Sequence, residues 1–98
     1  MNFDQMQGNA KKAESMLKML ANSNRLLILC NLVQSEKTVN EIVEIVGLSQ
    51  SAISQHLAKL RNEGIVECEK RGQLVYYRIC SPEVSAILST LYLIYCRD

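Results

Sequence analysis

Residues 38–80 read TVNEIVEIVGLSQSAISQHLAKLRNEGIVECEKRGQLVYYRIC, and this stretch decides the fold of the chain. Apolar side chains recur at helical spacing over 39–46. Gly47 follows them, and glycine tolerates the positive φ of a sharp helix exit. A second helical pattern covers 50–62, and residues 65–80 then alternate between apolar and polar side chains, as a β-hairpin does. This order predicts a winged helix-turn-helix, a mainly α fold with a β-hairpin wing.

The second helix of the predicted helix-turn-helix (39–62) has two contrasting faces. Ser49 is a suitable N-cap for it, because the serine hydroxyl accepts a free backbone N–H. Ile53, Leu57 and Leu60 recur at helical spacing and are expected to be buried. The opposite face carries short, mostly uncharged side chains, which suit contact with base edges in the major groove. Taken alone, this face is equally well explained as serine-rich solvent-exposed surface, but the turn and the hairpin favour DNA. We expect DNA contacts from Gln50, Ser51, Ser54, Gln55, His56, Lys59 and Arg61.

The hairpin over 65–80 is the predicted wing, and we place its loop at Arg71-Gly72. That loop predicts two cross-strand pairs, Cys68 with Val75 and Val66 with Tyr77. The tip of the hairpin is short and basic, which suits contact with DNA phosphates rather than with bases. An ordinary solvated β-turn is the alternative interpretation. The tip residues expected at the phosphates are Lys70, Arg71 and Gln73.

The composition predicts one domain, 1–98, that associates with a second copy of itself. With 98 residues the chain is near the small end of what folds alone, yet 48% of it is apolar. The strongly apolar helix predicted over 24–34 belongs in the core, whereas amphipathic helices at 10–20 and 82–97 flank the module. We expect these two helices to form a homodimer that reads a palindromic site with two recognition helices. The predicted dimer surface includes Leu17, Leu20, Leu88 and Leu91.

Charge and hydropathy restrict the setting of the protein. The formal net charge is only +1, which is low for a DNA-binding domain, although basic residues outnumber acidic ones between 49 and 78. No apolar run approaches the roughly 20 residues of a membrane span, and the N-terminal residues lack the apolar core of a signal peptide. We therefore expect a cytoplasmic protein without membrane contact, whose four cysteines are thiols.

Three segments resemble the ArsR/SmtB family of bacterial dimeric repressors. They are LSQSAISQHL (48–57), LRNEGIV (60–66) and the pair Tyr76-Tyr77 near the end of the wing. The resemblance covers nearly the whole chain. It implies a winged helix whose terminal helices form the dimer interface, and an inducer that lowers the affinity for operator DNA.

The sensing residues divide this family into subtypes. Arsenic-sensing members carry a Cys-x-Cys pair near the recognition region, but residues 39–49 contain no cysteine. Zinc-sensing members use Asp and His on the last helix, but residues 84–98 contain no histidine. The single histidine, His56, is expected to form a hydrogen bond within the helix-turn-helix or to DNA. Since Cys-x-x-Cys is also absent, we predict neither a metal site nor a cofactor.

Cys30 and Cys96 resemble the cysteine pair of the thiol-based, persulfide-sensing branch of the family (BigR, SqrR and HlyU). The resemblance implies that reactive sulfur species are the inducer, and that they join the two thiols within one subunit. Judged by its apolar neighbours alone, Cys30 is better explained as a core residue. Arg97 is the only nearby cation that could activate a thiol. Cys68 and Cys80 are interpreted as structural or incidental, with no sensing role.

Two other functions stay open at this point. The same cysteines could serve a metal- or haem-responsive repressor of the ArsR type. The fold could also be a protein-interaction or architectural module, which the low net charge would suit. Catalysis is not expected, because the sequence shows no base paired with a nucleophile, no carboxylate pair in an apolar setting and no phosphate-binding loop.

Overall fold

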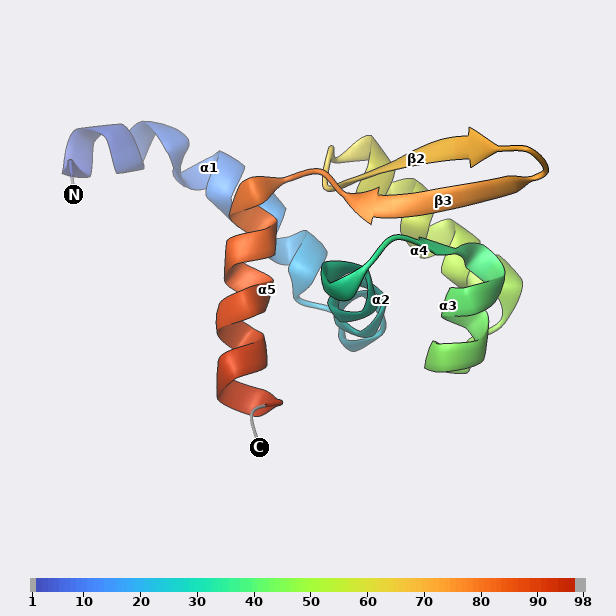
Figure 1. Ribbon diagram of the computed structural model, residues 1–98. Coiled ribbons are helices and arrows are strands. Elements are labelled where there is room, and N and C mark those ends of the chain that lie inside the picture. The colour runs from blue at the N-terminus through green and yellow to red at the C-terminus, as the bar shows by residue number, and fades with distance from the viewer. Residues whose placement is uncertain (1, 97–98) are drawn as a thin grey trace.

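The computed structural model describes residues 2–96, and over that range it forms a winged helix-turn-helix of five helices and a three-stranded antiparallel sheet. The helices are α1 (Phe3–Leu20), α2 (Ser23–Gln34), α3 (Val39–Val46), α4 (Gln50–Asn62) and α5 (Pro82–Tyr95). The strands are β1 (Lys37–Thr38), β2 (Val66–Arg71) and β3 (Leu74–Ile79), in the order β1-β3-β2. In Figure 1 the β2–β3 hairpin extends from one side of the helices, and α5 stands on the opposite side.

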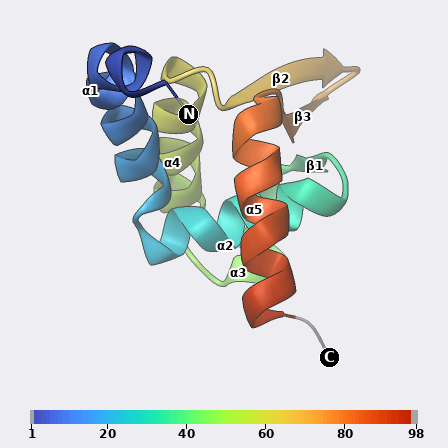
Figure 2. The same cartoon turned by 90° about the vertical axis from the view of Figure 1, so that its left-hand side faces the viewer.

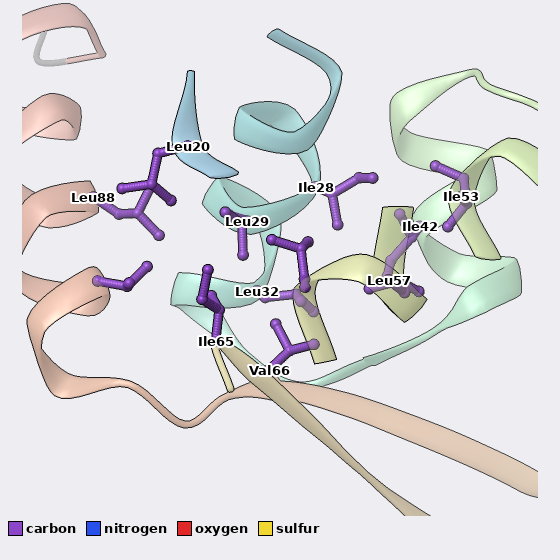
Figure 3. Packing of buried hydrophobic residues seen from close by; sticks show 12 residues of the cluster. Leu20, Ile28, Leu29, Leu32, Ile42, Ile53, Leu57, Ile65, Val66 and Leu88 are labelled. Atoms are coloured by element: carbon purple, nitrogen blue, oxygen red, sulfur yellow. The ribbon is translucent and has the colours of Figure 1, made fainter. Parts of the chain in front are cut away.

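A single apolar core connects the helices to the base of the hairpin. The predicted burial of Ile53, Leu57 and Leu60 is confirmed, since none of the three is exposed to solvent. Figure 3 shows side chains of α2, α3 and α4 converging on this part of the core. Because these side chains fix the rotation of α4 about its axis, its polar face is turned to solvent. The buried apolar residues are Leu20, Ile28, Leu29, Leu32, Ile42, Ile53, Leu57, Leu60, Ile65, Val66, Val84 and Leu88.

The turn of the helix-turn-helix is formed as predicted. Gly47 ends α3 in the left-handed region, with φ 82°, and its N–H donates to the carbonyl of Val43 at 2.9 Å. Ser49 caps α4, and its hydroxyl accepts the N–H of Ala52 at 3.2 Å. These two local contacts set the angle between α3 and α4, and so the direction in which α4 leaves the core.

Helix α1 begins at Phe3, seven residues before the predicted start at Ala10. The side chain of Asn2 caps it by accepting the N–H of Gln5 at 3.1 Å. Residues 3–9 are all exposed, so this part has no core-facing stripe by which the sequence could reveal it. In Figure 1 the N-terminal part of α1 projects away from the other elements.

The register of the hairpin differs from the prediction by two residues. Cys68 pairs with Tyr77 and Val66 with Ile79, so the two-residue loop is Gly72-Gln73 rather than Arg71-Gly72. The reason is the turn itself. The first loop position has a φ of 64°, which glycine adopts without strain, so Arg71 stays in the strand and pairs with Leu74. A shift of two keeps every side chain on its predicted face.

The short strand β1 was not predicted, and it joins the wing to the end of α2. Lys37 pairs with Tyr77 and Thr38 with Tyr76, so β1 lies along β3, as Figure 2 shows. Thr38 then caps α3 in a capping box with Glu41, which the Thr-x-x-Glu spacing could have revealed. The wing is therefore anchored to the helical body along one strand and not only at its base.

Two expectations about the burial of helical residues need correction. Helix α2 is only partly core, because Leu27 and Val33 are 51% and 37% exposed. Leu20 and Leu88, predicted at the dimer surface, are buried within their own subunit, whereas Leu17 is 52% exposed. Ser81 caps α5 and Pro82 is its first residue, as predicted. Within residues 2–96 no helix is both long and apolar enough to span a membrane.

Candidate DNA interface and thiol site

The polar face of α4 is positioned as a reading surface. Gln50, Ser51, Ser54, Gln55, Lys59 and Arg61, all predicted to contact DNA, are exposed. The packing of α4 against α3 and against β2 leaves this face uncovered within the chain. The helix also begins in short side chains and places its two basic residues, Lys59 and Arg61, in its last turn. Such a helix can press its N-terminal part close to bases and leave cations for the flanking backbone.

His56 is the exception among these residues, since it is half-buried at the edge of the face. Within residues 2–96 its Nδ1 atom is buried without a hydrogen-bond partner, so the expected bond inside the helix-turn-helix does not form there. Burial lowers the pKa of His56, and the positive charges of Arg25 and Lys59 lower it further. The imidazole is therefore neutral at physiological pH and adds no charge to the DNA-facing side.

The three wing residues predicted to contact phosphates differ in whether their polar groups are already engaged. Lys70 and Gln73 are exposed at the tip, as a phosphate contact requires. Arg71 is instead engaged: its guanidinium forms a forked ion pair with Glu36 and a second pair with Glu69, and it lies 4.9 Å from the ring centre of Tyr76. Glu36 was not among the predicted residues. It precedes β1, and no local pattern links it to a partner 35 residues away in the sequence.

Cys30 and Cys96 are brought to the same region by the packing of α2 against α5. Cys30 is half-buried and lines a mainly apolar cavity of about 410 Å³ with Val33 of α2 and with Leu88, Tyr92 and Leu93 of α5. Cys96 is exposed and is the C-cap residue directly after α5, where its N–H donates to the carbonyl of Tyr92 at 2.8 Å. One turn of helix thus separates Cys96 from the wall of the cavity that holds Cys30.

The electrostatics of Cys30 do not favour a reactive thiolate in the resting protein. Burial raises the pKa of Cys30, and the nearby Cys96 raises it further, because two thiolates repel each other. Arg97, the cation predicted to offset it, lies outside the described residues.

The other two cysteines occupy different places. Cys68 is half-buried on β2, opposite Tyr77, and Cys80 is exposed after β3, where its thiol donates to the carbonyl of Gly64 at 3.4 Å. All four cysteines are free thiols. In the described part of the chain, no group of three His, Cys, Asp or Glu side chains is arranged to hold a metal ion.

A winged helix-turn-helix that presents a polar recognition helix defines the class as a DNA-binding transcriptional regulator. Comparison with known proteins specifies this further. A family model described as "Bacterial regulatory protein, arsR family" matches residues 22–67. The transcriptional activator HlyU of Vibrio cholerae is 45% identical over 97 residues, covering 99% of this chain and 90% of HlyU. The chain therefore belongs to the ArsR family of bacterial transcriptional regulators, which are not enzymes.

Two further relatives show how closely the architecture is kept. The crystal structure of HlyU from Vibrio vulnificus superposes with a TM-score of 0.90 at 47% identity, covering 98% of this chain and all of that one. The repressor BigR from Xylella fastidiosa also gives a TM-score of 0.90, at 32% identity and with both chains fully covered. HlyU of Vibrio cholerae is named an activator and BigR a repressor, so the shared fold does not fix the direction of regulation.

Proposed function

We propose that the protein is a homodimeric regulator that binds a palindromic operator, and that reactive sulfur species lower its DNA affinity by linking Cys30 to Cys96. The observation that carries this proposal is the placement of the two thiols. Cys30 lies on α2 in the wall of an apolar cavity, and Cys96 caps the end of α5 one turn beyond that wall. A link between them would tie the end of α5 to the middle of α2.

Exposed apolar surface on the terminal helices supports the dimer. Leu17 of α1 and Leu93, Ile94 and Tyr95 of α5 are all more than half exposed. So much apolar surface on the two terminal helices is typical of an interface between subunits. A two-fold axis through these helices would present two copies of α4 to successive major grooves, where we infer contacts from Gln50, Ser51, Ser54, Gln55, His56, Lys59, Arg61 and the wing residues Lys70 and Gln73. Arg71, the third predicted wing residue, is already paired with Glu36 and Glu69. Such a regulator would work in the bacterial cytoplasm, where its DNA lies.

The proposed chemistry balances without an added oxidant. The Cys30 thiolate attacks the outer sulfur of a persulfide RSSH and releases the thiol RSH, and a second equivalent extends the chain to a Cys30 trisulfane. Cys96 then attacks the middle sulfur of this trisulfane and expels hydrogen sulfide. Two thiols and two persulfides thus give one trisulfide bridge, two RSH and one hydrogen sulfide. The sulfane sulfur is the oxidant. The extra sulfur atom also lengthens the bridge beyond the roughly 4.4–6.8 Å between Cα atoms that a direct disulfide demands.

The experiment combines mass spectrometry with DNA binding. An operator is first selected from random duplexes with the reduced protein, which is then exposed to an organic persulfide. We expect a Cys30–Cys96 peptide with one additional sulfur and a weaker affinity for the operator, typically by about 1–3 kcal/mol for such coupling. Hydrogen peroxide should act poorly, since it brings no sulfur to lengthen the bridge.

Three cysteine variants complete this test. Cys30→Ser and Cys96→Ser should bind the operator normally and lose the response. Cys80→Ser removes another exposed thiol and should keep the response, which makes it the matched control. If Cys96→Ser still releases DNA on persulfide treatment, the two-thiol mechanism is wrong.

A further inference from the structure

Five charged side chains form one ion-pair cluster where the wing meets the segment before β1. Its members are Glu36, Glu67, Glu69, Arg71 and Arg78. Three carboxylates face two guanidinium groups, so the formal charge of the cluster is −1. This face of the wing therefore offers DNA no net positive charge, although it carries both arginines of the wing, Arg71 and Arg78.

Arg71 is held by the two carboxylates nearest to it. Two nitrogens of its guanidinium donate to the two carboxylate oxygens of Glu36, and Nε donates to Glu69 at 2.8 Å. A forked pair of this kind uses the geometry with which arginine binds a phosphate, and it occupies the same donors. Both acids are ionised at neutral pH, because Arg71 lowers the pKa of Glu36 and that of Glu69.

We propose that Glu36 and Glu69 act as an internal phosphate mimic, which withholds Arg71 from DNA and so suppresses binding to non-operator sequences. Phosphate contacts carry no sequence information, and every free cation strengthens binding to all DNA alike. This inference rests on the proposed function, in which the wing lies against the DNA backbone. A guanidinium that must leave two carboxylates before it meets a phosphate contributes little to nonspecific affinity.

The test measures the affinity of the reduced protein for a fluorescent duplex of random sequence over a range of salt concentrations. In Glu36→Gln, Arg71 still has Glu69, so the double variant Glu36→Gln with Glu69→Gln should show the full effect. Each freed arginine adds one phosphate contact per subunit. The slope of log K against log salt should therefore steepen by about 2 per dimer. When salt falls from about 200 to about 50 mM, the double variant should gain roughly tenfold more affinity than the wild type gains.

Two controls separate release of Arg71 from the loss of negative charge. Glu63 forms no ion pair within residues 2–96, and Glu67 pairs with Arg78 and not with Arg71. The double variant Glu63→Gln with Glu67→Gln removes the same charge and should leave the salt slope near that of the wild type. Arg71→Ala placed in the Glu36→Gln, Glu69→Gln background should abolish the gain.

The two possible roles of the ion pairs predict opposite changes in the affinity for random DNA. If the ion pairs merely position the wing, Glu36→Gln and the double variant will bind random DNA more weakly than the wild type, and the proposal is overturned. An equal gain in the Glu63, Glu67 control, or a gain that survives Arg71→Ala, overturns it as well. Failure of the wild-type protein to bind any duplex would instead refute the DNA-binding function itself. Thermal melting of each variant confirms that the folded protein is compared.

Discussion

Replacing Ile94 by Asp should separate the two subunits. The side chain is 62% exposed near the end of α5, and unlike Leu93 it does not line the cavity beside Cys30. Full burial of an isoleucine is worth about 1.5–3 kcal/mol, so covering the exposed part is worth about 1–2 kcal/mol per subunit and about 2–4 kcal/mol per dimer. A carboxylate forced into the same apolar contact has no partner and adds a desolvation cost. The dimer dissociation constant should therefore rise by about 100-fold or more.

Sedimentation velocity over a dilution series measures this change, and anisotropy with the selected operator measures its consequence. Ile45→Asp is the matched control, because Ile45 is 54% exposed but lies on α3, away from the terminal helices. The control should stay dimeric. A folded Ile94→Asp protein that sediments like the wild type, at concentrations where the control is dimeric, would show that this side of α5 is not the interface.

Three further predictions concern reading and stability. Ser54→Ala and Gln55→Ala should each weaken operator binding by about 1–3 kcal/mol and leave random-duplex affinity unchanged; equal losses on both duplexes would exclude base reading. Leu57→Ala, at a site with no solvent exposure, should lower the free energy of urea unfolding by about 2–5 kcal/mol. His56 has a lowered pKa when folded, so it takes up a proton more readily when unfolded, and stability should fall as the pH drops below the ordinary value of 6.5. Because it is the only histidine, His56→Leu should remove that pH dependence, and an unchanged profile would refute the assignment.

The sequence predicted best those parts of the fold that local rules determine. The bounds of α3 and α4, the turn at Gly47 and the cap at Ser49 follow from helical spacing and from the conformational preferences of single residues. The start of α1 lacked such a signal, since its first residues face solvent. Strand β1 has only two residues and is defined by its pairing with β3, which no pattern within the segment reveals.

Prediction of the site shows the same division. The polar face of α4 could be identified because the burial of its opposite face fixes it. Whether Arg71 is free depends on Glu36, which is distant in the sequence and reaches the wing only because β1 pairs with β3. The cavity beside Cys30 likewise depends on how α5 packs on α2, so the sequence could name the thiol but not its surroundings.

The low net charge of the chain becomes consistent with DNA binding once the ion pairs are considered. Arg71 and Arg78 are bound to carboxylates, whereas Lys59, Arg61 and Lys70 form no ion pair within residues 2–96. These three unpaired cations of α4 and the wing would give a dimer a phosphate footprint of about six contacts, which is enough for salt-dependent binding to a duplex. Strong nonspecific attraction would hide the contribution of a serine- and glutamine-rich recognition face, because uncharged contacts to bases add only a few kcal/mol. Limiting the free cations therefore raises the share of the binding energy that depends on sequence. In the proposed homodimer, a change at the subunit interface that disturbs this face would then release the protein from its operator.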